Sequence, residues 1–214
     1  MRIGLGCTTF NRPDCLAKWK EQIAKHTSMD NVLIYIAEDT DMDRKGVAKR
    51  KNECLRALKD CDYIFLFDDD CWPINDNWVE FFINSEKKHL LFLNERLHRE
   101  FAFENNKINS CGLYRDCGGV FMYMTKECVH KVGAFNEAFK IWGFEHAEYS
   151  QRIYKSGLIK SPYLCLNGTD KYLYSCDYSD TAHRSSISQY EKDVNFKLNK
   201  PIFEKPIKNI YLPI

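Results

Sequence analysis

The sequence predicts an α/β fold, with a mixed, mostly parallel sheet flanked by helices in a single domain. Apolar segments at 2–9, 32–37 and 63–67 have the length of buried strands, and amphipathic helical patterns separate them. The segment 63–67 is apolar at every position, which is typical of a strand covered on both faces. With 214 residues, of which 44% are hydrophobic, the chain is long enough to bury one sizeable core.

The first strand leads into a polar loop and then into a helix. Ile3, Leu5 and Cys7 alternate with small residues over 2–9, and Pro13 follows at a position that suits the first turn of a helix. The loop between them carries the hydrogen-bonding side chains Thr8, Thr9, Asn11 and Arg12. At the carboxyl edge of a sheet these side chains have two alternative roles, either to bind a base and a phosphate or to cap the helix.

The second strand ends in the acidic loop 38–43. A carboxylate such as Asp39 can accept the imino hydrogen of a uracil ring, whereas the other acids of this loop are expected to face water. The following helix, 46–58, has an apolar stripe that Arg50 and Lys51 interrupt. We expect this cationic break to bind an anion. The alternative is that both side chains extend past the edge of the core.

The third strand ends abruptly in three carboxylates, Asp68, Asp69 and Asp70. Because side chains alternate along a strand, a continued extension would direct Asp68 and Asp70 to one side and Asp69 to the other. Open α/β sheets bind ligands in the crevice beyond the carboxyl ends of their strands, and paired hard oxygens suit Mg²⁺ or Mn²⁺. The pattern therefore favours a metal that bridges a diphosphate. The alternative is a solvated acidic turn, because Asp is common in turns.

Later elements complete the predicted sheet. We expect a helix at 77–83, strands at 90–93 and 117–125, and a short helix at 126–132. The polar segment 95–112 has no period, and a loop of this length in a compact domain usually has a function. Gly118 and Gly119 begin the last strand, where they permit a close approach of the backbone to a ligand.

A helix that ends at Gly157 carries the candidate catalytic residues Glu145, His146 and Glu148. Glu145 and His146 lie in its first turn, where the positive end of the helix dipole faces incoming anions. Glu148 stands four residues before Arg152, so a simple ion pair along the helix is the alternative for that residue.

The composition limits the partners that we expect. Lys and Arg total 31 against 30 Asp and Glu, and the formal net charge of +1 favours neither nucleic acid nor an anionic membrane as a partner. No apolar run approaches the ~18 residues that span a bilayer and no leader precedes the first strand, so we expect a cytoplasmic protein. The ten cysteines contain no Cys-x-x-Cys pair, so a zinc site is not expected. Residues 1–200 form the predicted domain, and 201–214 form a proline-punctuated tail on its surface.

Four landmarks, in this order, resemble one family of enzymes. They are the loop Thr8-Thr9-Phe10-Asn11-Arg12, the acid Asp39, the DXD motif Asp68-Asp69-Asp70, and Val132-Gly133-Ala134-Phe135-Asn136-Glu137 leading into Trp142-Gly143-Phe144-Glu145-His146. Over residues 2–157 the chain is similar to nucleotide-sugar glycosyltransferases of the GT-A, Rossmann-like fold, in the large family-2 group. The resemblance implies metal-dependent transfer of a hexosyl-type sugar from a UDP-sugar to a glycan or glycoprotein acceptor.

The resemblance also implies roles for individual residues. Thr8, Asn11 and Asp39 would hold the nucleoside, and Arg50 would contact the ribose or the diphosphate. Asp68 would face the ribose and the sugar, Asp70 would bind Mn²⁺ or Mg²⁺, and His183 would complete the metal site. The donor-binding candidates are Thr8, Thr9, Asn11, Arg12, Asp39, Arg50, Asp68, Asp69, Gly118 and Gly119, and the metal candidates are Asp70, Asp68 and His183.

One position departs from the family pattern. In inverting relatives the helix start reads Glu-Asp and the Asp is the general base, whereas this chain has His146 at that place. An imidazole can serve as a base near neutral pH. Glu145 and Glu148 are the alternatives, and a retaining enzyme would need no such base, so the stereochemistry stays open. Transferases of this size occur in bacterial surface-glycan pathways and in large algal DNA viruses that build capsid glycans, where the host cytoplasm would be the location.

Two other classes of function stay open. A nucleotidyltransferase also uses a metal on a similar sheet, but it normally needs a glycine-rich first loop, which Thr8-Thr9-Phe10-Asn11-Arg12 is not. The second class is a binding module that keeps the nucleotide-sugar pocket and has lost the chemistry. The altered Glu145-His146 pair is the feature that favours this class.

Overall fold

The computed structural model describes residues 1–92, 111–113, 118–176 and 185–214 of the chain. Its central sheet has the spatial order β2-β1-β3-β7-β5. The strands are β1 (Ile3–Phe10), β2 (Val32–Asp39), β3 (Tyr63–Asp68), β5 (His89–Phe92) and β7 (Gly118–Thr125). β1 pairs in parallel with β2 and β3, whereas β7 is antiparallel to β3 and to β5. The predicted mixed, mostly parallel sheet is confirmed.

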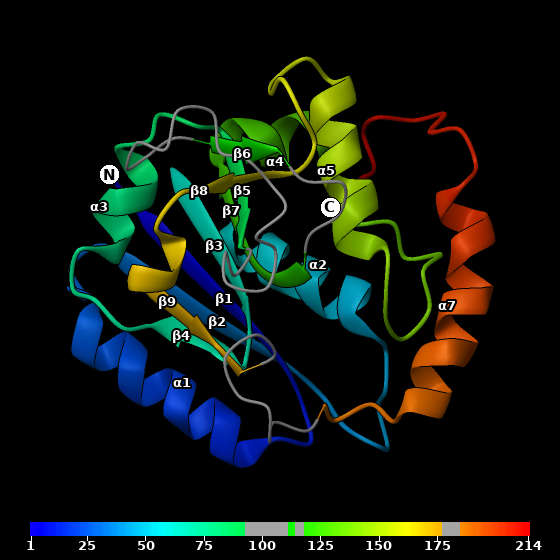
Figure 1. Cartoon of the computed structure of the whole chain (residues 1–214), viewed down its shortest axis with the longest axis horizontal. Coiled ribbons are helices and arrows are strands. Elements are labelled where there is room, and N and C mark those ends of the chain that lie inside the picture. The colour runs from blue at the N-terminus through cyan, green and yellow to red at the C-terminus, as the bar shows by residue number, and fades with distance from the viewer. Residues whose placement is uncertain (93–110, 114–117, 177–184) are drawn as a thin grey trace.

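Helices cover both faces of this sheet (Figure 1). α1 (Pro13–His26) and α3 (Trp78–Ile83) pack on one face, and α2 (Val47–Leu58), α4 (Lys126–Val132) and α5 (Glu145–Lys155) pack on the other. In β3 the side chains of Phe65 and Phe67 enter the core under α1 and α3, and those of Ile64 and Leu66 enter the core under α2, α4 and α5. The run of apolar residues in β3 therefore has the predicted cause, because successive side chains enter opposite cores.

Among the described residues there are also two small antiparallel strand pairs that the sequence analysis did not predict. β4 (Cys71–Pro73) pairs with β9 (Leu173–Ser175), and β6 (Cys111–Leu113) pairs with β8 (Leu164–Leu166). A one-turn 3-10 helix, η1 (Thr169–Lys171), connects β8 to β9. The amide of Cys176 donates to the carbonyl of Asp70 at 2.9 Å, so this late part of the chain is attached directly to the acidic strand end.

The chain continues into a long helix, α7 (Gln189–Phe203), that the sequence analysis did not predict. Ser188 and Glu191 form a capping box at its start, with reciprocal hydrogen bonds between side chain and backbone. The helix passes without a break through residue 200, where the sequence analysis placed the end of the domain, and it includes Pro201. After α7, Leu212 exchanges backbone hydrogen bonds with Val132 and Ala134 at 3.0 and 2.8 Å.

His89 links the sheet to α5 from a fully buried position. Its Nδ1 lies 2.8 Å from the carbonyl oxygen of Tyr123, and its Nε2 lies 2.8 Å from the hydroxyl of Ser150. Burial lowers the pKa of His89 to about 4, so the ring is neutral in the folded protein at neutral pH. The unfolded chain binds a proton at this residue near pH ~6.5, and folding therefore opposes protonation.

We predict that His89 makes the protein less stable as the pH falls from about 6.5 toward 4. Its contribution to the free energy of unfolding should fall by about 2 kcal/mol between about pH 8 and about pH 5. Burial raises the pKa of Asp69 to about 7, which acts in the opposite sense over the same range, so the comparison needs a variant. In urea unfolding, the wild type should therefore lose about 2 kcal/mol of unfolding free energy relative to His89→Gln between about pH 8 and about pH 5. His130→Gln, at an exposed position, should show no such change.

Candidate active site

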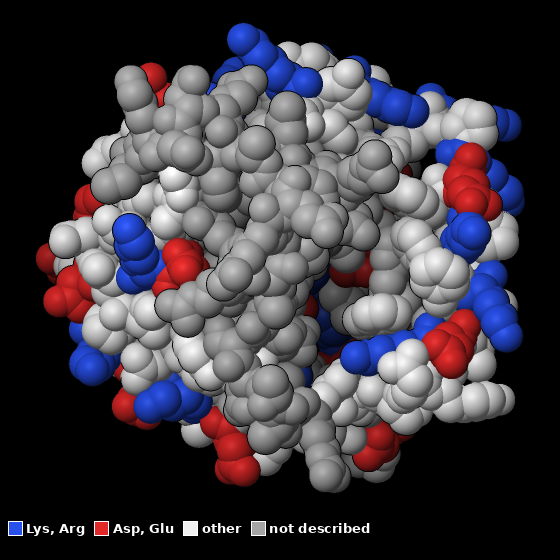
Figure 2. Space-filling view, in the orientation of Figure 1, with Lys and Arg blue, Asp and Glu red and all other residues white. Residues whose placement is uncertain are grey.

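A cleft with a volume of about 80 Å³ lies at the carboxyl edge of the sheet. The ends of β1, β2 and β3 meet there, as the predicted topology requires. Its walls include Thr8, Asp39, Arg50, Asp68, Asp70 and Trp142. Figure 2 shows a hollow on this face of the molecule, with acidic and basic side chains in its depth. Residues that are far apart in the sequence therefore form one polar site.

The guanidinium group of Arg12 bridges two of the three carboxylates. Its Nη1 lies 2.5 Å from Asp70 Oδ2, and its Nη2 contacts Asp69 Oδ1. The hydroxyl of Thr9 donates to the other oxygen of Asp69 at 2.5 Å. Burial opposes the charge of Arg12, but Asp70 and Asp69 outweigh it and raise the pKa of the guanidinium. β3 ends at Asp68, so the extended alternation does not continue; Asp68 and Asp70 line the cleft nevertheless.

The ammonium group of Lys51 lies between the third carboxylate and α5. Its Nζ is 3.7 Å from Asp68 Oδ1 and 3.5 Å from Glu145 Oε1, and it donates to the carbonyl of Gly119 at 2.9 Å. The hydroxyl of Thr8 donates to Asp68 at 2.9 Å. Burial opposes the charge on Lys51, but Asp68 and Glu145 outweigh it and raise the pKa of Lys51. This one side chain therefore ties α2 to β3, β7 and α5.

The site contains more acidic than basic side chains. Four carboxylates, Asp68, Asp69, Asp70 and Glu145, face the two cations Arg12 and Lys51 among the described residues. When all four are ionised, the surplus is two negative charges, which matches one divalent cation. No group of three His, Cys, Asp or Glu that could hold a metal by itself is found within the described ranges. Two carboxylates completed by substrate phosphates are a usual Mg²⁺ site, so Asp68 and Asp70 fit the ion. His183 lies outside the described residues.

Glu145 is engaged on both carboxylate oxygens. Its Oε2 accepts the amide of Gly143 at 3.1 Å, and its Oε1 lies 3.3 Å from Nδ1 of His146 in addition to its contact with Lys51. Burial raises the pKa of Glu145, but Lys51 and His146 outweigh it and hold this pKa well below its usual range. Glu145 therefore stays ionised, and its contacts fix the position of His146, whose side chain is 18% exposed.

Gly119 makes room for the ring of His146. A Cβ atom at Gly119 would lie 2.6 Å from both Cγ and Nδ1 of His146, which is closer than such atoms approach. Gly118, the first residue of β7, stands opposite Phe92 in the sheet. The sequence analysis expected this glycine pair beside the donor sugar. The structure shows that Gly119 allows the helix start to pack against β7, and the contact with a sugar stays a prediction.

Asp39 and Arg50 hold the loop between β2 and α2. Asp39 accepts the amides of Lys45 and Gly46 at 2.7 and 2.8 Å, and Nε of Arg50 at 2.8 Å. Arg50 also pairs with Glu53 at 3.0 Å. Like Lys51, Arg50 thus meets carboxylates of the chain itself. The protein itself thus supplies anionic partners for the cationic break in the helix, and the binding of an added anion there stays a prediction.

Two candidates lie apart from the carboxylate cluster. The side chain of Asn11 donates to Asp41 at 2.9 Å and so joins the first two loops. Glu148 forms the alternative ion pair with Arg152, at 2.9 Å, and Arg152 in turn donates to the carbonyls of Val132 and Ala134. The structure therefore brings Glu145 and His146 to the site, whereas Glu148 forms an ion pair with Arg152. Lys51 lies in the site but was not among the candidate site residues, although the interruption of the apolar stripe of its helix had indicated this position.

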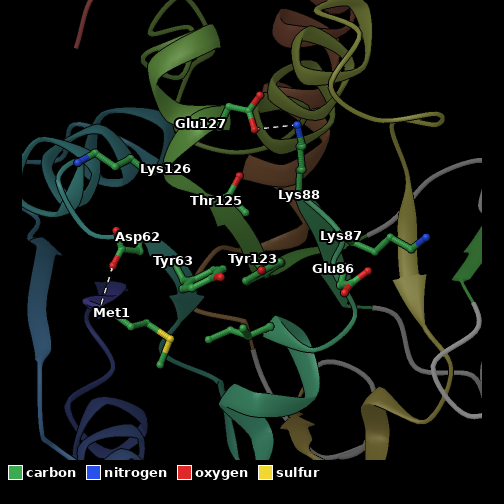
Figure 3. Close-up of a pocket in the computed structure, with 11 residues that line it drawn as sticks. Met1, Asp62, Tyr63, Glu86, Lys87, Lys88, Tyr123, Thr125, Lys126 and Glu127 are labelled. Carbon is green, nitrogen blue, oxygen red and sulfur yellow. Dashed lines mark ion pairs between the residues drawn. The ribbon is translucent and has the colours of Figure 1, made fainter.

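A second cavity, of about 580 Å³, lies at the amino end of β3 (Figure 3). The stacked rings of Tyr63 and Tyr123 form part of its wall. Lys88 and Glu127 pair across it at 2.7 Å, and the amino group of Met1 lies 3.8 Å from Asp62. The carboxyl edge is the better candidate for an active site, because the ends of three strands bring acidic and basic side chains together there.

We predict that Lys51→Met, which keeps the side-chain length and removes the charge, lowers the free energy of unfolding by about 3–5 kcal/mol. The reason is that the buried Glu145 and the partly buried Asp68 lose their shared cation. Urea unfolding measures the change. Lys49→Met, at an exposed position on the same helix, should change the stability by less than about 0.5 kcal/mol. An equally small effect for Lys51→Met would show that the two carboxylates need no cation.

Comparison with known proteins identifies relatives of this fold. The profile of a family described as the N-terminal domain of galactosyltransferase matches residues 98–172. An uncharacterised glycosyltransferase of Acanthamoeba polyphaga mimivirus is 27% identical over 123 residues, which cover 53% of this chain and 48% of that protein. The match therefore spans about half the length of the curated relative.

Solved glycosyltransferases share the architecture at low identity. A mutant Drosophila β1,4-galactosyltransferase 7, in complex with manganese, UDP-Gal and xylobiose, matches with a TM-score of 0.59 and 17% identity over 98% of this chain and 82% of that chain. GalNAc-T7 with UDP, GalNAc and Mn²⁺ matches with a TM-score of 0.55 and 11% identity over 78% of this chain and 42% of that chain. The chain therefore has the GT-A glycosyltransferase fold, and a viral glycosyltransferase is its distant homologue.

Proposed function

We propose that the protein transfers a sugar from a UDP-sugar donor to a hydroxyl group of a glycan or glycoprotein, with Mn²⁺ or Mg²⁺ as cofactor. The observation that carries this proposal is the cluster of four carboxylates and two cations at the carboxyl edge of the sheet, of which Asp68 and Asp70 line the cleft. Support comes from the solved relatives, which were crystallised with UDP-Gal and manganese or with UDP and Mn²⁺.

Asp68 and Asp70 would hold the divalent cation together with the diphosphate of the donor. When bound, the ion neutralises the negative charge that develops on the departing diphosphate. Arg12 holds the Asp70 carboxylate in place from one oxygen, at 2.5 Å. Thr8 and Lys51 hold Asp68 in the same way, so both carboxylates are oriented before the donor arrives.

Asp39 is the proposed contact for the base. A carboxylate offers about four acceptor positions, and the chain uses three of them here, two on Oδ1 and one on Oδ2. The remaining position on Oδ2 can accept the imino hydrogen of uracil. Because two backbone amides and Arg50 fix this carboxylate at the cleft wall, its direction is set in advance. This geometry supports uridine as the nucleoside.

His146 is the proposed general base. It would take the proton of the acceptor hydroxyl as the acceptor oxygen bonds to the anomeric carbon and the bond from that carbon to UDP breaks. Such a direct displacement inverts the configuration at the anomeric carbon. Glu145 would orient the imidazole through Nδ1, at 3.3 Å, and stabilise the positive charge that the ring acquires. Trp142, 36% exposed at the cleft wall, would contact the acceptor sugar.

Calorimetric titration of UDP in the presence of Mn²⁺ tests the donor site. We predict binding that is lost with EDTA and weakened more than about tenfold, or ~1.4 kcal/mol, by Asp70→Asn, because one metal ligand is lost. Asp30→Asn, at an exposed position before the amino end of β2 and so at the opposite edge of the sheet, is the control and should bind UDP normally. Equal binding without metal and without the Asp70 carboxylate would refute the assignment.

Replacement of His146 tests the base. We predict that His146→Ala lowers kcat for sugar transfer by about 10²–10⁴-fold and leaves the affinity for UDP unchanged. His146→Asp should recover part of the rate. The acid limb of its pH–rate profile should move to lower pH, because carboxylates release their proton about two pH units below imidazoles. Full activity of His146→Ala would remove the residue from the mechanism, and absence of transfer by the wild type with UDP bound would favour a binding module.

A further inference from the structure

We propose that α7 positions the segment Trp142–His146, and that Asn199 is the positioning residue through which it does so. This inference rests on the proposed function only where it concerns catalysis. α7 stands at the edge of the molecule beside α5, and its inner face meets the loop that leads into α5 (Figure 1). The family profile that matches this chain ends at residue 172, before α7 begins.

Asn199 joins α7 to the backbone of this loop by three hydrogen bonds. Its Oδ1 accepts the amide of Lys140 at 2.9 Å, and its Nδ2 donates to the carbonyls of Trp142 and Gly143 at 2.8 and 3.1 Å. The side chain is fully buried. Because one partner is a donor and two are acceptors, the carboxamide has one possible orientation, and no side chain of similar size other than Asn supplies both functions.

The loop that Asn199 holds has an unfavourable backbone conformation. Gly143 has a φ of 96°, and Phe144 has a φ of 71°, in the left-handed region that is unfavourable for a residue with a side chain. The ring of Phe144 packs against two rings of α7, with centroids 5.1 Å from Phe196 and 5.0 Å from Phe203. Both contacts hold the ring of Phe144 against α7 while its backbone has this conformation.

The conformation of Phe144 sets the start of α5. Phe144 is the residue immediately before the helix, and Glu145 and His146 are its first two residues. Gly143 also donates its amide to Glu145, at 3.1 Å, so the loop and the carboxylate are one hydrogen-bonded unit. By holding this loop, α7 therefore also sets the position of Glu145 and of the proposed base His146.

The amino end of α7 is attached to the opposite wall of the cleft. Glu191 pairs with Arg44 at 2.6 Å, and the guanidinium of Arg44 lies 4.2 Å from the ring centre of Phe10, at the end of β1. Lys192 lies 5.5 Å from the ring centre of Trp142. α7 therefore fixes the loop relative to the end of β1, while the carboxylates Asp68 and Asp70 are held by Arg12 and Lys51 instead. Loss of the Asn199 contacts should affect acceptor chemistry and spare UDP binding.

Asn199→Ala and Asn195→Ala form a matched pair. Both side chains are buried on α7, but Asn195 donates to the carbonyl of Glu191 within the same helix. We expect amide hydrogen exchange over residues 140–146 to become at least about tenfold faster in Asn199→Ala and to stay unchanged in Asn195→Ala. Asn199→Asp, which keeps an acceptor for Lys140 and loses both donated bonds, should show the same change and serves if Asn199→Ala does not fold.

Kinetics separate a positioning role from simple stabilisation. We expect kcat/KM for the acceptor to fall at least about tenfold in the Asn199 variants, with the Kd for UDP and Mn²⁺ within about twofold of wild type. Unchanged amide hydrogen exchange at 140–146 would show that Asn199 does not hold the loop. Faster exchange with normal transfer, or an equal loss of UDP binding, would overturn the positioning role. If the wild type binds UDP and transfers no sugar, the proposed function fails while the exchange data still decide whether α7 holds the loop.

Discussion

Four carboxylates at one sheet edge, three of them buried and Asp68 partly exposed, are the constraint on which the rest of the site depends. Such groups are costly to remove from water unless cations and hydrogen-bond donors meet them. Arg12 meets Asp69 and Asp70, and Lys51 meets Asp68 and Glu145. To satisfy these pairs, the loop after β1, the helix α2, the end of β3 and the start of α5 must converge. The ion pairs thus impose the geometry of the cleft.

These ion pairs are better explained by function than by stability. A buried ion pair often contributes no more than a well-packed apolar substitute, because the desolvation cost offsets the attraction. What the arrangement provides is a set of fixed charges before any ligand arrives, which is how a protein stabilises charge that develops in a reaction. Asp68 and Asp70, which line the cleft, and the partly exposed His146 are the groups placed to act on a ligand.

The elements that the sequence predicted are those whose buried faces are apolar. β3 was predicted because Ile64 through Phe67 enter two apolar cores. α7 was not, because its inner face includes the buried polar residues Asn195 and Asn199, while Tyr190, Val194 and Leu198, at a helical spacing of four, are exposed. An apolar period indicates burial only when apolar side chains make the contact. The pairs β4–β9 and β6–β8 have strands of three residues, too short to show a period.

The sequence by itself determined the sheet, the acidic strand end and the set of polar residues at the carboxyl edge. Only the tertiary structure decided which of them meet. Glu145 and Glu148 are the same residue type three positions apart, yet one faces Lys51 and the other faces Arg152. Lys51 and Glu145 are separated by 94 positions, so no local pattern connects them. Local sequence fixes the residue type and the period of each element, whereas the partner of a buried charge depends on which elements the packing of the core brings together.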